Sequence, residues 1–425
     1  MVNSEKIMDI IEKKNRKIIT ISIYLLFLVI FFCSSQLKYY KLNNKIFNNG
    51  TGVNIHFTGN PIDITLLKDA GFKYVRRDMF WSTIENNKSK FDFKNTGYDQ
   101  LTNSLIDNGI TPYYILNYSN KLYEANSSIV TEKGRKAFCK FVEEATIRYK
   151  NKGIVWEIWN EPNGGFWEPK PNYDEYALLV EEVSKVIKKN DPSGIIVAPA
   201  LAGLNKQSLD WLNEILKRGM INNIDALSVH PYRGYNPETV IQDYQSLREL
   251  ITKYTKKKVP IISGEWGYST GKGWAGLNLT DQQQAEYAAR MFLINHYEKI
   301  PISIWYDWKD DGTNPNNGEH NFGLRENDVT KPKLSYYSVK ALNKIFNGYK
   351  YNRRIYTGNN NDYVLVFKNV DGKIRIASWT TEHSHEITIP DDIKGEVISM
   401  YGENIGSIKN SKITISSSPI YITKD

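Results

Sequence analysis

Two glutamates that each end a short apolar run are the residues of this sequence best suited to chemistry. Glu161 belongs to the Trp-Asn-Glu-Pro motif of residues 159–162, which closes the apolar run 154–159. Glu265 follows a second such run, residues 259–264. Cleavage of a glycosidic bond uses two carboxyl groups, because one protonates the leaving oxygen while the other acts at the anomeric carbon. The pair therefore predicts a site for glycoside hydrolysis.

Side chains at other predicted strand ends suit the binding of a sugar or of a catalytic carboxylate. Asn160 can hydrogen-bond a sugar hydroxyl beside the reacting carbon, and the hydroxyl of Tyr232 can hold a neighbouring carboxylate. Arg76, on the second predicted strand, can keep a nucleophilic carboxylate ionised. Trp305 and Trp308, at the eighth strand, offer flat apolar faces to a sugar ring.

Three further polar residues lie in predicted strands or at their ends. His230 ends the sixth strand, and its position favours a functional role over that of a core histidine, because this face of a barrel is catalytic. His56, at the end of the first strand, could equally bind substrate or pack in the fold. Glu157 lies four residues deeper than Glu161, so we expect it to pair with a basic residue inside the barrel.

Short apolar runs alternate with amphipathic segments, which is the pattern of an α/β protein with a (β/α)8 TIM barrel. A doubly wound open sheet would not explain why polar side chains collect at so many strand ends. The catalytic barrel is expected at residues 51–347. We expect strands at 52–57, 72–77, 110–117, 153–160, 194–200, 224–230, 259–265 and 301–308. We expect helices near 62–70, 96–109, 131–150, 173–190, 207–219, 238–254, 280–299 and 334–346.

The pattern changes after residue 347. Short segments such as 363–367 and 374–379 alternate apolar and polar residues, and turn residues such as Asp371-Gly372 separate them. This alternation is typical of antiparallel strands with one buried face. We therefore expect a small antiparallel β-domain at 348–425, supporting the barrel rather than carrying chemistry.

The N-terminus predicts attachment to a membrane. Residues 1–45 hold eight basic and three acidic residues and so carry most of the net charge of +8, which makes nucleic acid an improbable partner. The basic segment 1–17 precedes the uncharged stretch 18–37, whose length favours an uncleaved anchor over a cleaved signal. Residues 38–50 suit a stalk. Because a basic flank stays in the cytoplasm, the barrel is expected outside it, anchored or, after cleavage, secreted.

No spacing in the sequence is typical of a metal site or a disulfide framework. The two cysteines, Cys33 and Cys139, lie far apart, one in the apolar N-terminal run and one in a predicted helix. His383 and His385 alternate on one face of a predicted strand, which favours a solvated strand over a pair of metal ligands.

These residues together resemble retaining glycoside hydrolases of clan A. The resemblance rests on the Asn-Glu-Pro motif, the second strand-end glutamate, the His-Pro-Tyr segment 230–232 and the tryptophan of the eighth strand. Segments 71–76 and 91–93 are similar to the opening of such barrels, and 322–325 with 331–333 to their close. The resemblance covers about residues 50–346. It is nearest to glycoside hydrolase family 39, in particular to exopolysaccharide-cleaving bacterial members with an added β-domain.

The resemblance implies a double displacement in which Glu161 is the acid/base and Glu265 the nucleophile, with no metal or cofactor. It places Asn160 at the sugar 2-hydroxyl, Tyr232 and Arg76 around the nucleophile, and His230 in the wall of the site. The implied substrate is a polysaccharide or oligosaccharide. The sequence departs from the resemblance at Ser263-Gly264, since such chains often have threonine or another polar residue before the nucleophile.

Two other functions use the same fold. One is a non-catalytic carbohydrate-binding or polysaccharide-assembly protein, which the presence of both glutamates disfavours. The other is a transglycosylase, which uses the same residues and differs only in the acceptor. The barrel fold alone does not distinguish these functions, because barrels host many chemistries.

Overall fold

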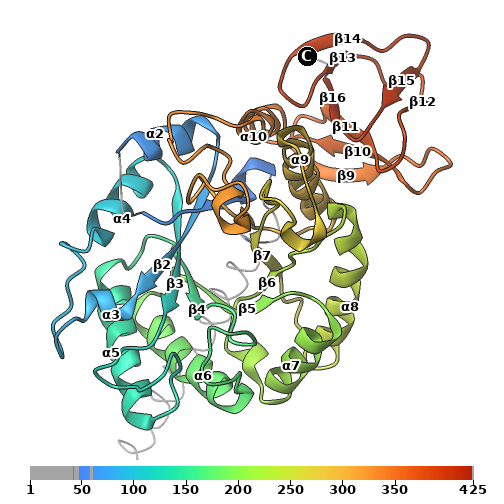
Figure 1. Cartoon of the computed structure of the whole chain (residues 1–425). Coiled ribbons are helices and arrows are strands. Elements are labelled where there is room, and N and C mark those ends of the chain that lie inside the picture. The colour runs from blue at the N-terminus through green and yellow to red at the C-terminus, as the bar shows by residue number, and fades with distance from the viewer. Residues whose placement is uncertain (1–41, 43–46, 58–60, 424–425) are drawn as a thin grey trace, which may run out of the picture. The chain divides into compact units, whose positions relative to one another are not determined.

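The computed structural model describes residue 42, residues 47–57 and residues 61–423 of the chain. Eight parallel strands close into a barrel in sequence order, and β1 completes the ring by pairing with β8 (Figure 1). The strands are β1 (Thr51–Asn54), β2 (Tyr74–Phe80), β3 (Thr111–Asn117), β4 (Val155–Ile158), β5 (Ile195–Ala202), β6 (Ala226–His230), β7 (Ile261–Trp266) and β8 (Ser303–Trp305). The predicted (β/α)8 barrel is therefore confirmed.

Helices surround the barrel and cover the outer faces of its strands. Thr280 illustrates how the sequence starts one of them: its hydroxyl accepts the Gln283 N–H while the Gln283 side chain accepts the Thr280 N–H. The α-helices are α2 (Pro61–Asp69), α3 (Trp81–Ile84), α4 (Tyr98–Asp107), α5 (Glu132–Arg148), α6 (Tyr173–Asn190), α7 (Lys206–Lys217), α8 (Val240–Thr252), α9 (Asp281–Tyr297) and α10 (Leu334–Ile345).

Strand β4 shows how alternation of side chains builds both the helix layer and the barrel interior. All four of its residues are buried. Trp156 donates its indole N–H to Asp191, 3.0 Å away, at the end of α6. Glu157 points the opposite way, where Arg76 lies 2.7 Å from its carboxylate and the Tyr113 hydroxyl donates to it at 2.8 Å. The expected pairing of Glu157 with a basic residue of the interior is confirmed.

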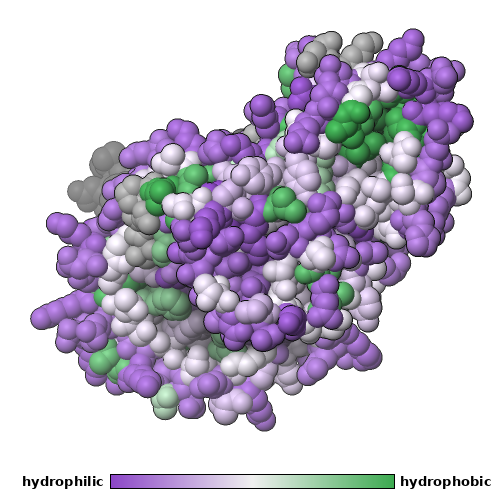
Figure 2. Space-filling view, turned by 45° about the horizontal axis from the view of Figure 1, so that its top comes forward, coloured by the Kyte–Doolittle hydropathy of each residue, from purple (hydrophilic) through white to green (hydrophobic). Residues whose placement is uncertain are grey.

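A C-terminal β-domain follows the barrel, as predicted. Its six-stranded antiparallel sheet has the order β14-β13-β16-β11-β10-β9, and β12 pairs with β15 in a separate ribbon. Figure 2 shows hydrophobic side chains gathered on the lobe that these sheets form, whereas the barrel is mostly hydrophilic in that view. The strands are β9 (Lys350–Arg354), β10 (Asp362–Lys368), β11 (Ile374–Thr380), β12 (His385–Thr388), β13 (Glu396–Ile398), β14 (Asn404–Ser407), β15 (Lys412–Ile415) and β16 (Ile420–Thr423).

The β-domain packs on the barrel through aromatic residues. Phe367 of β10 packs at a tilt against Phe346 at the end of α10, with ring centroids 4.6 Å apart. The buried indole of Trp379 on β11 donates to Glu238, 2.7 Å away, in the 3-10 helix η3 (Pro237–Thr239) that follows β6. Tyr401 donates its hydroxyl to Gln282 of α9. Trp379 and Tyr401 therefore join the two domains in this structure.

The predicted segments 1–17, 18–37 and 38–50 lie almost entirely outside the described residues. Of the last, the structure describes residue 42 and the 3-10 helix η1 (Phe47–Gly50). Among the described residues, no helix combines the length and the apolar character needed to cross a membrane. The membrane anchor and the stalk stay predictions.

Candidate active site

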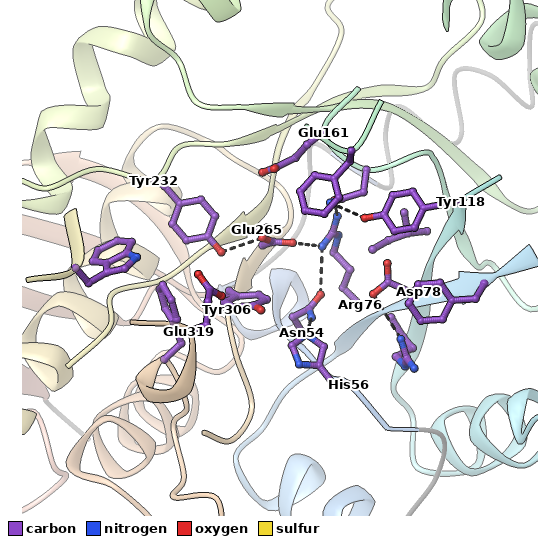
Figure 3. A pocket seen from close by; sticks show the side chains of 17 residues that line it. Asn54, His56, Arg76, Asp78, Tyr118, Glu161, Tyr232, Glu265, Tyr306 and Glu319 are labelled. Atoms are coloured by element: carbon purple, nitrogen blue, oxygen red, sulfur yellow. Dashed lines mark hydrogen bonds and ion pairs between the residues drawn. The ribbon is translucent and has the colours of Figure 1, made fainter. Parts of the chain in front are cut away.

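The candidate site is a cavity of about 660 Å³ at the carboxyl ends of the barrel strands (Figure 3). Glu161 comes three residues after the end of β4, and Glu265 lies on β7 one residue before its end. Arg76 on β2, Tyr232 after β6 and His56 after β1 also line the cavity. Because all strands are parallel, their carboxyl ends meet at one rim, which is where barrel enzymes hold their chemistry.

The two glutamates face each other at short range. One carboxylate oxygen of Glu161, one of Glu265 and one ring nitrogen of His230 all lie within 4.8 Å of one another. Both glutamates remain open to solvent, with side chains 17% and 13% exposed. The backbone of Glu161 has φ 46° and that of Trp159 has φ 68°. Non-glycine residues adopt such values at a cost, and they concentrate at functional sites.

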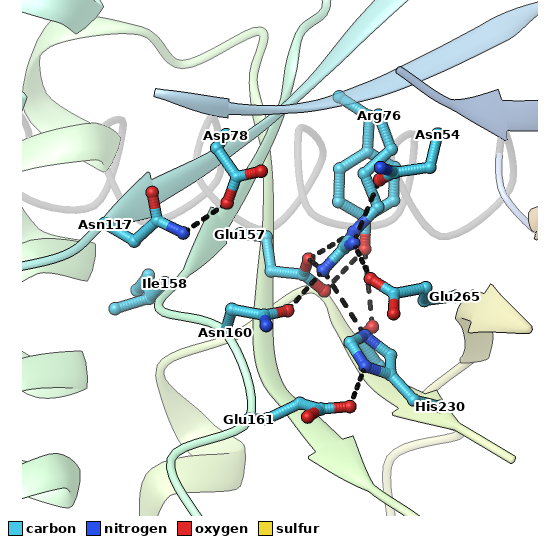
Figure 4. Close-up of polar contacts among 12 residues, drawn as sticks. Asn54, Arg76, Asp78, Asn117, Glu157, Ile158, Asn160, Glu161, His230 and Glu265 are labelled. Carbon is cyan, nitrogen blue, oxygen red and sulfur yellow. Dashed lines mark hydrogen bonds and ion pairs between the residues drawn. The ribbon is translucent and has the colours of Figure 1, made fainter. Parts of the chain in front are cut away.

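Arg76 joins the interior of the barrel to the candidate site (Figure 4). Its guanidinium forms an ion pair with Glu157 and another with Glu265. It also donates to Asn160 Oδ1 at 2.8 Å and to Asn54 Oδ1 at 3.2 Å. Although burial disfavours the charged guanidinium, Glu157 and Glu265 hold the pKa of Arg76 well above its usual value. Arg76 is therefore a fixed positive charge beside Glu265.

His230 connects Arg76 to Glu161, and its two contacts assign its tautomer. Arg76 lies 3.3 Å from Nε2, and a guanidinium can only donate, so Nε2 accepts and carries no proton. The proton of the neutral ring is then on Nδ1, which donates to Glu161 Oε1 at 2.8 Å. This bond occupies Oε1 and leaves the second carboxyl oxygen of Glu161 to carry a transferable proton.

Tyr232 contacts the other glutamate. Its hydroxyl donates to Glu265 Oε1 at 2.9 Å, while Arg76 contacts Oε2. Burial and the negative charge of Glu265 hold the pKa of Tyr232 well above its ordinary value. The phenol therefore stays protonated and remains a donor, so each oxygen of the Glu265 carboxylate has one donor from the protein.

Asn160 and His56 also reach the cavity, each with part of its polar side chain already bound by the protein. Besides accepting from Arg76, Asn160 donates through Nδ2 to the Tyr118 hydroxyl at 3.2 Å. Asn54 Nδ2 lies 3.1 Å from His56 Nε2, and Asp311 lies 2.9 Å from His56 Nδ1. Both residues line the cavity.

Trp305 and Trp308 do not line this cavity, contrary to their expected role as sugar platforms. Both side chains are buried. Trp305 donates its indole N–H to the Phe322 carbonyl at 3.2 Å, and Trp308 donates to Asp63 at 2.6 Å. Tyr306, between them in sequence, lines the cavity instead. Both indoles point away from the cavity and pack against the helix layer and the loops around it.

Several lining residues are not identified by sequence reasoning. Asp78 follows Arg76 by two residues on β2. Residues two apart on a strand face the same side, so the position of Asp78 could have been predicted from that of Arg76. Glu319 lies in a 3-10 helix of the long loop after β8, where no sequence pattern marks it. Burial and the neighbouring charge of Glu265 raise the pKa of Glu319. Tyr118, Phe166, Tyr306 and Phe322 complete an aromatic wall that also includes Trp274.

Two groups of potential metal ligands occur among the described residues. One is Glu161, His230 and Glu265, and the other is His56, Asp307 and Asp311. In both groups the ring nitrogens of the histidine already face protein partners, and Arg76 supplies the positive charge beside Glu265. The residues of neither group are arranged as free ligands, so we assign neither to a metal.

The barrel, with carboxylates after β4 and on β7, is consistent with a glycoside hydrolase of clan A. Residues 41–312 match the family model described as "Cellulase (glycosyl hydrolase family 5)", and the chain belongs to this family. The predicted glycosidase class is thereby confirmed.

Known proteins of the same class are similar to this chain. A probable mannan endo-1,4-beta-mannosidase C from Aspergillus terreus is 24% identical over 286 residues, which cover 59% of this chain and 67% of that protein. A family 39 glycoside hydrolase from Bacteroides cellulosilyticus WH2 has a TM-score of 0.76 at 23% identity, covering 89% of this chain and 82% of that one. A family 39 beta-xylosidase from Caulobacter crescentus has a TM-score of 0.64 at 16% identity, covering 89% and 96%. The fold is therefore also similar to that of family 39 enzymes.

Proposed function

We propose that this protein hydrolyses O-glycosidic bonds of a polysaccharide by double displacement, with Glu161 as acid/base and Glu265 as nucleophile. The separation of the glutamates carries the proposal, because one oxygen of each lies within 4.8 Å of the other. Retaining enzymes hold their carboxyl groups about 5–5.5 Å apart, whereas inverting enzymes need about 6.5–9.5 Å to admit a water molecule.

In the first step, an oxygen of Glu265 attacks the anomeric carbon and the bond to the leaving oxygen breaks. Glu161 gives that oxygen its proton, so the leaving group departs as an alcohol and Glu161 becomes a carboxylate. In the second step, Glu161 takes a proton from water, the hydroxide attacks the anomeric carbon and Glu265 is released. Both glutamates return to their starting states, and no other reactant is consumed.

The residues around the pair fit these roles. Tyr232 and Arg76 each donate to one oxygen of Glu265, so they favour the ionised form that attacks. His230 holds one oxygen of Glu161 and thereby orients the other oxygen toward the cavity. Asn160 has its amide oriented by Arg76 and Tyr118, at the cavity surface beside Glu161.

An uncharged sugar fits the cavity best. Both arginines of its lining are already paired, Arg76 with Glu157 and Glu265, and Arg77 with Asp78 at 3.4 Å. An acidic sugar would meet the lining carboxylates without a free guanidinium to compensate. The names of the related enzymes point to β-linked glucose, mannose or xylose units as first substrates to test.

We place the reaction outside the cytoplasm, in keeping with the basic segment and the apolar stretch 18–37 of the sequence. An exported barrel would meet cell-surface or environmental polysaccharides. An uncleaved apolar stretch would keep it at the membrane, and a cleaved one would release it.

The stereochemistry of the product tests the mechanism. Purified protein is incubated with 2,4-dinitrophenyl β-glycosides of glucose, mannose and xylose, and proton NMR identifies the anomer formed first. We expect the β-anomer. An α-anomer would overturn double displacement, and folded protein that turns over no substrate would favour a binding protein. Transfer of the sugar to an added alcohol in preference to water would identify a transglycosylase.

A further inference from the structure

The barrel has a second face at the amino ends of its strands, opposite the candidate active site. Because all eight strands are parallel, the loops that lead from a helix to the next strand meet at this face, which we call the basal face. None of the described residues that line the candidate active site belongs to these loops. The loops are residues 70–73, 108–110, 149–154, 191–194, 218–225, 253–260 and 298–302.

The exposed charges on the loops of the basal face have one sign. Their acidic residues, Asp191, Asp225 and Glu298, are buried or half-buried, whereas Arg218 and six lysines are exposed. Arg218 is paired with acidic residues of α6 and α7. None of the six lysines forms an ion pair within the described part of the chain. These basal lysines are Lys150, Lys253, Lys256, Lys257, Lys258 and Lys299.

The rest of the barrel surface mixes charges of both signs. On the helices, exposed lysines are paired with acids one turn away, as Lys136 is with Glu132 on α5. The loops at the carboxyl ends of the strands expose acids among their lysines, for example Asp92, Glu168 and Asp328. On the loops of the basal face, by contrast, no exposed acid offsets the basal lysines, so these loops produce a positive potential.

The basal face is also where the chain enters the barrel. Strand β1 begins at Thr51, directly after η1, and its amino end lies at this face. In the sequence, the uncharged stretch that we predict as a membrane anchor ends at residue 37. Residues 38–46 lie between that stretch and η1, and nine residues span at most about 30 Å. An anchor at 18–37 would therefore keep the basal face close to a bilayer.

We infer that the basal face binds the surface of a membrane that contains anionic phospholipids, with the basal lysines contacting the lipid phosphates. Clusters of lysine beside a membrane anchor are attracted to anionic headgroups, and a flexible ammonium adapts to a phosphate from many directions. This orientation points the candidate active site away from the bilayer, toward polymers in the surrounding medium. The inference goes beyond the proposed function and does not depend on catalysis.

The test measures which lysines a bilayer covers. Full-length protein is reconstituted into vesicles of phosphatidylcholine, with or without phosphatidylglycerol. A membrane-impermeant reagent acetylates accessible lysines, and peptide mass spectrometry compares the basal lysines with Lys121 and Lys170 on the opposite face. We expect phosphatidylglycerol to lower the relative labelling rate of the basal lysines about threefold or more. Salt at about 1 M should restore that rate, because the Debye length falls to about 3 Å.

Two charge-reversal variants locate the contact. The first changes the three lysines of segment 256–258 (K256E, K257E, K258E), and it should abolish the protection of Lys150 and Lys299 by phosphatidylglycerol. The second is the matched control, because it reverses three exposed charges on the loop between α3 and α4, at the opposite face (K88E, K90E, K94E). The control should keep the protection, since its basal face is unchanged.

The possible failures are distinguishable. Labelling of the basal lysines that ignores phosphatidylglycerol would overturn the inference. An equal loss of protection in both variants would overturn it too, because net charge alone would then explain the attraction. Protection by soluble dextran sulfate, without protection by phosphatidylglycerol, would identify a polyanion as the partner instead of a membrane. Protein that elutes apart from neutral vesicles would contradict the predicted anchor, while its labelling in anionic vesicles would still decide the role of the basal face.

Discussion

Arg76 is the side chain through which the candidate catalytic residues are coupled. It contacts Glu265 directly, and it fixes the tautomer with which His230 donates to Glu161. Lysine could not replace it, because a single ammonium cannot serve five partners in a fixed planar arrangement. The two glutamates therefore have different environments. Glu265 accepts hydrogen bonds from a cation and a phenol, whereas Glu161 accepts one from a neutral imidazole.

The first prediction concerns Glu161. Glu161→Gln removes the proton donor, so cleavage of oligosaccharides should slow by about a hundredfold to ten-thousandfold. Dinitrophenyl glycosides need no protonation of their leaving group, so their first step should slow far less. Pre-steady-state release of dinitrophenol measures that step. Glu132→Gln, at an exposed position of α5, is the matched control. Equal losses of the first step on both substrates would contradict the acid role.

The second prediction concerns Glu265. Glu265→Gln should abolish turnover of every glycoside while the protein stays folded, because the amide cannot form the glycosyl ester. A dinitrophenyl 2-deoxy-2-fluoro glycoside that fits the site should label Glu265 of the wild-type protein. Peptide mass spectrometry locates the label, and a label on Asp78 or Glu319 would assign the nucleophile elsewhere.

The third prediction concerns Asp307, which is buried beside His56. Burial and the negative charges of Asp311 and Asp310 hold the pKa of Asp307 well above its ordinary value. From about pH 4 upward the unfolded chain has lost this proton while the folded chain keeps it, so stability falls by up to ~1.4 kcal/mol per pH unit. Asp307→Asn lacks this loss. Its stability relative to wild type should rise between pH 4 and 7 in urea unfolding, and a constant difference would contradict the prediction.

At the scale of elements, the β-domain is attached to the barrel at the loop that carries Tyr232. Glu238 lies at the other end of that loop from Tyr232, and it receives the Trp379 indole and both arms of the Arg290 guanidinium. These groups are buried. A buried ion pair that loses a donor keeps its desolvation cost, so the contact is expensive to break.

The fourth prediction therefore concerns Trp379. Trp379→Phe keeps an aromatic ring but removes the donor to Glu238, and it should lower the free energy of unfolding by about 1–3 kcal/mol. Denaturant unfolding measures the change, with Tyr356→Phe as a control at an exposed position of the β-domain. Unchanged stability together with weaker retention by polysaccharide would instead identify the domain as a carbohydrate-binding module.

Site residues at the ends of strands could be predicted from the sequence, whereas site residues in the loops could not. Glu161 and Glu265 were recognisable because each follows an apolar run within two residues, and parallel strands bring such ends together. Trp305 and Trp308 do not reach the cavity because both indoles are buried, one against the Phe322 carbonyl and the other against Asp63 of α2. Phe166 and Glu319 depend on contacts between loops far apart in sequence, which no local pattern records.

At the scale of the whole molecule, the sequence combines a basic and apolar N-terminus with a remainder of low net charge, since residues 1–45 carry +5 of the total +8. The fifth prediction follows from this arrangement. Full-length protein should fractionate with membranes and be cleaved by external protease once any cell wall is removed. Moving the four basic residues of segment 13–17 to the other flank of the apolar stretch should reverse this exposure. Intact full-length protein in the cytosolic fraction would contradict the predicted export.

The attachment of Trp379 to Glu238 has a consequence for how the enzyme would fail on heating. The β-domain stabilises the segment between β6 and α8 through this contact, and Tyr232 lies at the active-site end of that segment. If the β-domain detaches first, the Tyr232 hydroxyl loses its alignment with Glu265 while the barrel is still folded. Activity would then be lost at a lower temperature than the helical circular dichroism signal. The difference between the two midpoint temperatures would report the stability of the contact between the β-domain and this segment.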